Sequence, residues 1–419
     1  YTIKANGKTV KGGKMSVNVE PQGSKEITIA TSGLKSKPGT EYFIYFNVTT
    51  TEPEPLIPVG HEIAYEQFRL PIEPGERTFA TGGPALKVSA EGNELTASSS
   101  KVNFVFDKKT GLVSSYKVGG TEYFKDGFGL QPNFWRAPND NDYGNGNPKR
   151  LQVWKQSSKN FNVVDANIVM DGKDAVLTAN YLLAAGNLYI VTYRISPSGV
   201  VKADFTFTST DMEAAKTEAS EATLMATFTP GSDAARKAAS KLEVPRIGVR
   251  FRLPAEMNQV EYFGRGPEEN YIDRNAGTLI DLYKTTADQM YFPYVRPQEN
   301  GHHTDTRWLT LNKKGGKGLT IYADKTIGFN ALRNSVEDFD GEETVSRPYQ
   351  WLNRDAGELV HDESKAKDQL PRKTHINDIT PRNFVEVCVD MKQQGVAGYN
   401  SWGARPEPGY NIPANQEYK

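Results

Sequence analysis

Apolar and polar residues alternate in short runs along most of this chain, and turn-forming residues separate the runs. In EYFIYFNVTT (residues 41–50), apolar side chains recur at every second position, as at Tyr42 and Ile44. Because successive side chains of a strand point to opposite faces, this period predicts a strand with one buried face. MSVNVE (15–20) and EITIAT (26–31) show the same alternation and are also predicted to be strands.

These strands predict a partial β-sandwich of immunoglobulin type over residues 1–80, since fewer than seven clear strands occur there. Residues 71–84, PIEPGERTFATGGP, contain three prolines and three glycines and are typical of a linker. Alternating runs then resume and predict one large all-β domain over residues 85–419. The Ala-rich segment 211–243 interrupts it, and we interpret this segment as a surface insertion without function, with a short helix over 233–242.

Composition narrows the classes of function. The chain has 419 residues, 37% apolar and 24% charged, with a net charge of −1, so we expect a globular protein of two or three domains that does not bind nucleic acid. No apolar run approaches the ~20 residues of a membrane helix. The only cysteine, Cys388, lies in the alternating run NFVEVCVDM and is predicted to be a buried thiol. Aromatic residues reach 11%, which favours strands and surfaces that stack on sugars.

Two motifs could suggest metal binding. In DNDYGNG (140–146), Asp140 and Asp142 alternate as in a calcium loop, but Gly144 takes the third ligand position and no Glu follows at the twelfth. Asx side chains that bond their own backbone explain these residues equally well. His302 and His303 are adjacent and point to opposite faces of a strand, so they cannot jointly hold one zinc ion. We therefore expect no metal site.

Two further loops are candidates for chemistry. FGRGPEENYIDRN (263–275) contains Glu268, Glu269 and Asp273, which could serve as acid or base, but a glycosidase needs two carboxyls about 5–10 Å apart across the sugar. A hydrogen-bonded loop pinned by arginines is the favoured interpretation. In GVAGYNSWGARPEPGYN, Trp402 stands among loop-forming residues, and composition leaves open whether it fills a core or offers its face to a ligand.

Five blocks in one order resemble a known family. They are FWRAPNDNDYG, PRIGVRFRLP, EYFGRGPEENYIDR, MYFPYVRPQENG with TRW following, and GYNSW. Together they resemble the last domain of glycoside hydrolase family 2 β-galactosidases of the LacZ type, over residues ~85–419. The stretches NGKTV, VEPQGSKEITI and VGHEIAYEQFRL are similar to the β-sandwich domain that precedes it in that family.

The resemblance implies an all-β chain: part of the family's penultimate sandwich, followed by a large β-supersandwich similar to galactose mutarotases. It also implies that the catalytic barrel, with its two glutamates, lies upstream and is absent here, so that no residue of this chain is catalytic. The chain would start within one domain and stop before the last strand of the next. Magnesium and sodium bind to earlier domains in the family, so no cofactor is expected in this part.

The resemblance assigns the site residues as well. Trp402 matches a tryptophan that contributes to the family's sugar site. The segment around Asp140, Asp142, Gly144 and Gly146 would border the pocket entrance. We interpret Phe134 and Trp135 as core anchors, residues 139–142 as a rigid Asx turn, and the two glycines as a hinge.

The expected parent enzyme hydrolyses terminal β-D-galactosides such as lactose with retention. Its partners would be the sugar and the barrel of the same polypeptide, and the intact enzyme can be an oligomer. The resemblance points to a bacterial protein without deciding between cytoplasm and periplasm. Two alternatives stay open: a mutarotase-like epimerase using His302 or His303 with Glu299, and a free-standing carbohydrate-binding module.

Overall fold

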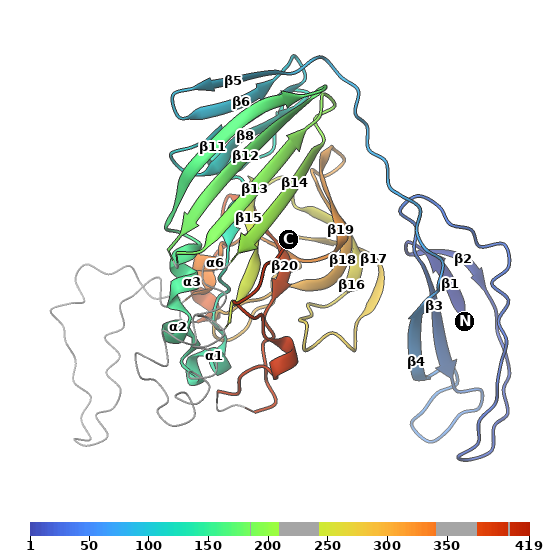
Figure 1. Ribbon diagram of the computed structural model, residues 1–419. Helices are drawn as coiled ribbons and strands as arrows, with labels where there is room; N and C mark the ends of the chain where they lie inside the picture. The colour runs from blue at the N-terminus through green and yellow to red at the C-terminus, as the bar shows by residue number, and fades with distance from the viewer. Residues whose placement is uncertain (185, 209–242, 341–374, 401–402) are drawn as a thin grey trace, which may run out of the picture.

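The computed structural model describes residues 1–184, 186–208, 243–340, 375–400 and 403–419. Their strands form four sheets, which confirms the predicted all-β class. Figure 1 shows the N-terminal strands as a separate blue sheet beside the larger body of the molecule. Within the described residues, no helix is long and apolar enough to span a membrane. The helix predicted over 233–242 and most of the Ala-rich insertion lie outside the described residues.

The N-terminal sheet has four antiparallel strands in the order β2-β1-β3-β4. They are β1 (Thr2–Ala5), β2 (Lys8–Gly12), β3 (Tyr42–Thr49) and β4 (Glu62–Arg69). Ile3, Tyr42 and Ile44 form a small core of their own, as the alternation in β3 predicts. This core is separate from the main one, although the boundary between residues 80 and 85 stays a prediction.

The prediction of strands at 15–20 and 26–31 is wrong, since the structure assigns no strand to either segment. Met15, Val17 and Val19 are each 43% exposed. An alternating segment becomes a strand only when a neighbour takes up its backbone hydrogen bonds, and no described strand pairs with these two. The alternation in these two segments is therefore not accompanied by hydrogen bonds to a neighbouring strand.

Two sheets form the first part of the large domain. One contains β5 (Lys87–Glu91), β6 (Glu94–Ser98), β7 (Val102–Asp107), β8 (Leu112–Val118) and β9 (Thr121–Glu122) in sequential order. The other contains β11 (Phe161–Asp171), β12 (Asp174–Leu183), β13 (Leu188–Ile195) and β14 (Val201–Thr208). Aromatic side chains join the sheets, for example Phe104 with Tyr193 at 5.4 Å between ring centroids. A hairpin turn at 109–111 connects β7 to β8, with Gly111 at φ 70°.

The third sheet of this domain has seven strands in the order β10-β15-β20-β19-β18-β16-β17. The strands are β10 (Gln131–Asn133), β15 (Arg246–Pro254), β16 (Gln259–Gly266), β17 (Leu279–Thr286), β18 (His303–Asn312), β19 (Gly318–Leu332) and β20 (Phe384–Gln393). One continuous apolar core joins all three sheets. Cys388 is buried in β20, as predicted, and burial raises the pKa of its thiol.

In the part of the chain that the structure describes, helices are few and short. Three of them, α1 (Asp140–Gly144), α2 (Asn147–Arg150) and α3 (Gln152–Ser157), follow β10 and lie together at the lower left of the body in Figure 1. The others are α6 (Val336–Phe339) and the 3₁₀ turns η1 (Lys125–Gly127), η3 (Ile376–Asp378) and η4 (Pro408–Tyr410).

The N-terminal sheet contacts the seven-stranded sheet through a small mixed patch. Phe43 packs with Phe263 and Ile280, all buried. The side-chain amide of Gln67 donates to the carbonyl oxygen of Ile280 at 2.8 Å and accepts from its amide at 2.9 Å. Glu41 pairs with Arg307 at 2.6 Å. We refer to these contacts as the junction.

Candidate functional site

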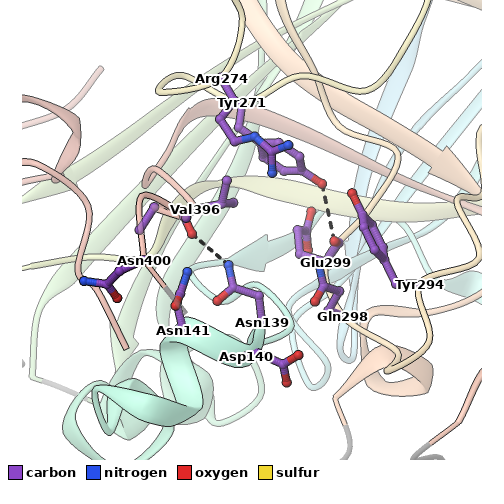
Figure 2. A pocket seen from close by; sticks show the side chains of 12 residues that line it. Asn139, Asp140, Asn141, Tyr271, Arg274, Tyr294, Gln298, Glu299, Val396 and Asn400 are labelled. Atoms are coloured by element: carbon purple, nitrogen blue, oxygen red, sulfur yellow. Dashed lines mark hydrogen bonds between the residues drawn. The ribbon is translucent and has the colours of Figure 1, made fainter. Parts of the chain in front are cut away.

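Four segments that are far apart in the sequence enclose a polar hollow of about 610 Å³ (Figure 2). The lining residues come from the start of α1, from the loop between β16 and β17, from the connection between β17 and β18, and from the segment after β20. They are Asn139, Asp140, Asn141, Tyr271, Arg274, Tyr294, Gln298, Glu299, Val396, Ala397, Gly398 and Asn400. Each segment belongs to one of the sequence blocks quoted above, so the fold brings four of the five blocks to one place.

The segment leading into α1 is held by buried side chains. Phe134 and Trp135 are buried, and the indole N–H of Trp135 donates to Asp340 at 2.8 Å. Asn139 then caps the helix: its side chain accepts from the amide of Asp142 at 2.9 Å, and the carboxylate of Asp142 accepts from the amide of Asn139 at 3.0 Å. This reciprocal pair satisfies two amide groups that a helix start leaves unbonded.

One local expectation for this segment needs correction, and a second stays a prediction. Residues 139–142 do make the expected Asx hydrogen bonds, but they form the first turn of α1 instead of an isolated turn. Gly144 is the last residue of that helix, and its role as a hinge stays a prediction. Gly146 alone has the left-handed backbone, with φ 74°, between α1 and α2. Adjacent capping bonds favour helix here because each one satisfies an amide of the same turn.

The four residues assigned to the pocket rim occupy different places. Asp140 lines the hollow, and its carboxylate lies 3.1 Å from Arg296. Asp142 is buried and paired with Arg136, at 2.5 and 3.1 Å, so it does not line the hollow. Gly144 and Gly146 are not lining residues either. Among the described residues, no three His, Cys, Asp or Glu side chains group as a metal site.

Buried charges form the floor of the hollow. The guanidinium of Arg246 is fully buried, donates to Glu299 at 2.5 Å and lies 3.2 Å from Asp390. Asn330 donates a further hydrogen bond to Glu299 at 3.2 Å. Burial raises the pKa of Asp390 to about 7, although Arg246 opposes that shift and Glu299 adds to it. Glu299 lines the hollow as a carboxylate that is already held from below.

Neither histidine lines the hollow. His302 stacks against Tyr271 with ring centroids 5.7 Å apart, and burial lowers its pKa well below the usual value. Nδ1 of His303 lies 3.0 Å from the carbonyl oxygen of Arg265, and burial lowers its pKa to about 4. Both rings are therefore neutral near pH 7 and enclosed, so the acid–base pair that an epimerase requires is not assembled with Glu299.

The loop 263–275 is held by hydrogen bonds, largely as expected. Arg265 pairs with Asp305 at 2.6 Å and donates to the carbonyl oxygen of Thr278 at 2.7 Å. Glu269 accepts from the amide of Gly301 at 2.7 Å and from the hydroxyl of Tyr294. Arg274 differs from the expectation that it pins the loop. It lines the hollow, and its guanidinium has no hydrogen-bond or ion-pair partner among the described residues.

Trp402 lies outside the described residues, but the residues on either side of that gap do not. Asn400 lines the hollow. Gly403 has φ 91° and packs so closely on α1 that a Cβ there would lie 2.5 Å from the carbonyl carbon of Gly144. The side chain of Asn145 donates to the carbonyl oxygen of Ala404 at 3.4 Å. The GYNSW segment is thus fastened to the DNDYG segment on its C-terminal side.

Sequence reasoning did not single out Asn139, Tyr294 or Gln298 as site residues. All three lie in the connections between strands, inside blocks that carry the family resemblance, and polar loop residues on a rigid sheet are frequent binding residues. Their position in those blocks could have identified them as candidate site residues.

Comparison with known proteins identifies the family. A family model described as "Beta galactosidase small chain" matches residues 98–419, and one described as "Beta-galactosidase, domain 4" matches residues 1–71. The chain belongs to the β-galactosidase small-chain family. Its match is to the C-terminal portion of LacZ-type enzymes, as the sequence blocks indicate.

Curated β-galactosidases match along most or all of the chain. That of Priestia megaterium is 29% identical over 421 residues, covering 100% of this chain and 35% of the relative. That of Halalkalibacterium halodurans is 24% identical, covering 100% of this chain and 36% of the relative. That of Kluyveromyces lactis is 30% identical over 272 residues, covering 64% of this chain and 24% of the relative. The chain thus spans about a third, or less, of the length of these relatives.

A solved galactose 1-epimerase from Lactobacillus acidophilus NCFM matches more distantly, with 7% identity and a TM-score of 0.27. The match covers 73% of this chain and 97% of the epimerase. That likeness is too remote to bear on function.

Proposed function

We propose that this chain is the non-catalytic C-terminal part of a retaining β-galactosidase. In this proposal, a catalytic barrel elsewhere in the intact enzyme supplies both reacting carboxylates. The polar hollow and Trp402 complete the sugar site and cover it. The observation that carries the proposal is the convergence of four family blocks on one hollow, whose wall ends at Asn400, two residues before Trp402.

The chemistry of the hollow suits a sugar. Side-chain amides of Asn139, Asn141 and Gln298 can both donate to and accept from hydroxyl groups. Arg274 adds guanidinium N–H groups that donate to no described residue. An indole beside this polar wall would offer an apolar face to the C–H face of the ring. Directional polar groups and one flat apolar platform are the combination by which a pyranose is oriented.

The same hollow is poorly suited to hydrolysis by itself. A retaining glycosidase uses two carboxyls about 5–5.5 Å apart, one as nucleophile and one as acid and base. The carboxylates that line the hollow are Asp140 and Glu299, and each already pairs with an arginine, Arg296 and Arg246. We therefore expect the isolated chain to leave β-galactosides intact.

A chromogenic galactoside assay on the purified chain tests this expectation, and hydrolysis above the buffer rate would contradict it. In the intact enzyme, Trp402→Ala should raise the KM for lactose by about tenfold, the loss of roughly 1.4 kcal/mol of stacking. Trp402→Phe keeps an aromatic face and should recover most of the affinity. Tyr399→Ala is the matched control, because that ring is 67% exposed in the same loop and does not line the hollow. An unchanged KM in Trp402→Ala would show that the indole of Trp402 does not contribute to sugar binding.

The alternatives receive less support. An epimerase would need a histidine facing the hollow, and His302 and His303 are both enclosed. A free-standing binding module usually presents two or three exposed aromatic rings in a row, and Trp402 is the persuasive candidate here. Polarimetry with α-galactose and calorimetric titration of the chain distinguish them. We expect no mutarotation and millimolar or weaker binding of galactose.

A further inference from the structure

After β20 the chain leaves the sheet and turns along residues 395–400 to form one wall of the hollow. The backbone conformation of this turn is uncommon. Ala397 has φ 57°, in the left-handed region that non-glycine residues rarely adopt, and Gly398 follows with φ 115°. No described strand pairs with the segment, so other groups must hold it in this conformation.

One carboxylate supplies most of what the turn needs. Oδ1 of Asp273 accepts from the amide of Val396 at 3.0 Å, and Oδ2 accepts from the amide of Ala397 at 2.8 Å. Gly395 lies so close that a Cβ there would be 2.5 Å from Oδ2 of Asp273. The carboxylate therefore spans two successive amides at the left-handed residue and fits against a glycine just before it.

The opposite side of the turn is braced as well. The side-chain amide of Asn139 donates to the carbonyl oxygen of Val396 at 2.9 Å, as Figure 2 shows. Arg136 donates to the carbonyl oxygen of Gly395 at 3.2 Å. Side chains from two distant segments, 136–139 and 273, thus hold both the donors and the acceptors of one short piece of backbone. Asp273 itself does not line the hollow.

We propose that Asp273 is a positioning residue for the sugar site: its carboxylate sets the backbone of residues 395–400 and so the place of Val396, Ala397 and Asn400 in the wall. This inference rests on the proposed function for the identity of the ligand. It assigns no acid–base role to Asp273, because both oxygens accept from the backbone. Asp273 therefore acts on the sugar only through the wall.

The first measurement needs no sugar. In the full chain, Asp273→Asn replaces one accepting oxygen by an amide nitrogen that faces a backbone N–H. Hydrogen exchange of the amides of Val396 and Ala397 should accelerate at least about tenfold, the effect of losing roughly 1.4 kcal/mol of local protection. Exchange along β20 should stay unchanged. Asp171→Asn, in the exposed β11–β12 hairpin, is the matched control.

Asn139→Asp is a second variant, which removes the hydrogen bond to Val396 and keeps the cap of α1. Aspartate keeps an oxygen to cap α1 but loses the N–H that reaches Val396, so α1 should persist while exchange near Val396 rises. It also keeps the test usable if Asp273→Asn does not fold.

The second measurement is made on the intact enzyme. Asp273→Asn should raise the KM for lactose about tenfold with kcat changed less than about twofold, because the wall acts on binding and not on the reacting bond. Unchanged exchange at Val396 and Ala397 overturns the proposal. Accelerated exchange with an unchanged KM overturns it too, since the wall would then not shape the site. If the unmodified enzyme has no activity on galactosides, the proposed function fails, while the exchange result still decides whether Asp273 holds the wall.

Discussion

Two places in this molecule use ion pairs to join segments that are distant in the sequence, and they do so at very different depths. Under the hollow, Arg246 is fully buried with Glu299 and Asp390. At the junction, the side chains of Arg307 and Glu41 keep 15% and 13% of their surface. A buried charge that loses its partner cannot turn to water, whereas a partly exposed one can. We therefore expect substitutions in the buried ion pairs under the hollow to cost much more unfolding free energy than substitutions in the ion pair at the junction.

The largest effect is expected at the floor. Arg246→Met fills similar space but leaves Glu299 and Asp390 buried without a cation, which should cost about 3–5 kcal/mol of unfolding free energy. Equilibrium urea unfolding of the chain measures this loss. Arg194→Met is the control, because Arg194 pairs with Asp171 and Asp174 on an exposed hairpin and should change little. A loss below about 1 kcal/mol for Arg246→Met would mean that water reaches the floor.

Two buried groups should respond to acid in opposite directions. The pKa of His303 is lowered by burial to about 4, from an ordinary 6.5, so between these values the unfolded chain binds the extra proton. Its contribution is complete above pH 6.5 and is lost as the pH falls, by about 2 kcal/mol between pH 7 and pH 5. The raised pKa of Asp390 acts in the opposite direction, since its contribution is lost as the pH rises from about 4 towards 7.

Comparison with a variant isolates the histidine. From pH 7 to pH 5, the unfolding free energy of His303→Gln should change by about 2 kcal/mol in the stabilising direction relative to the change in the unmodified chain. His61→Gln, at an exposed position, serves as the control. An identical pH dependence in His303→Gln and the unmodified chain would show that the buried ring is not what acid titrates.

The junction should give a smaller effect. In a double-mutant cycle, Glu41→Gln and Arg307→Met should show a coupling of about 1 kcal/mol or less. The coupling should shrink further in 1 M salt, because charges in contact with water are screened. Urea unfolding of the four proteins measures it. A salt-independent coupling above about 3 kcal/mol would show that the Arg307–Glu41 pair behaves like the buried pairs of Arg246, which would contradict the expected difference between the two places.

The smallest effect is expected at the rim. The side chain of Asp140 is 73% exposed, so Asp140→Ala should change the unfolding free energy by less than about 0.5 kcal/mol, in spite of its ion pair with Arg296. Asp142→Ala removes the partner of Arg136 and one half of the capping box, and should cost several times more. Equal losses in the two variants would contradict the assignment of one aspartate to the rim and the other to the interior.

Features that depend on near neighbours in the chain were predictable from the sequence. The alternation in residues 41–50 identifies a strand and its buried face, and the polar cluster after Pro138 identifies a site of Asx hydrogen bonds. The two errors in strand prediction have one physical origin. Residues 15–20 and 26–31 alternate as strands do, but a strand also needs a partner, and alternation carries no information about partners.

The all-β class, the buried face of individual strands and the family could all be predicted from the sequence, because each depends on local pattern or on the order of the quoted blocks. Only the tertiary structure decided that Asn139, Arg274, Glu299 and Asn400 face one hollow, and that Asp140 lies at its rim while Asp142 pairs beneath it with Arg136. The physical reason is that the fate of a polar side chain depends on the groups that surround it in space, and the groups around the hollow come from four separate segments between residues 139 and 400.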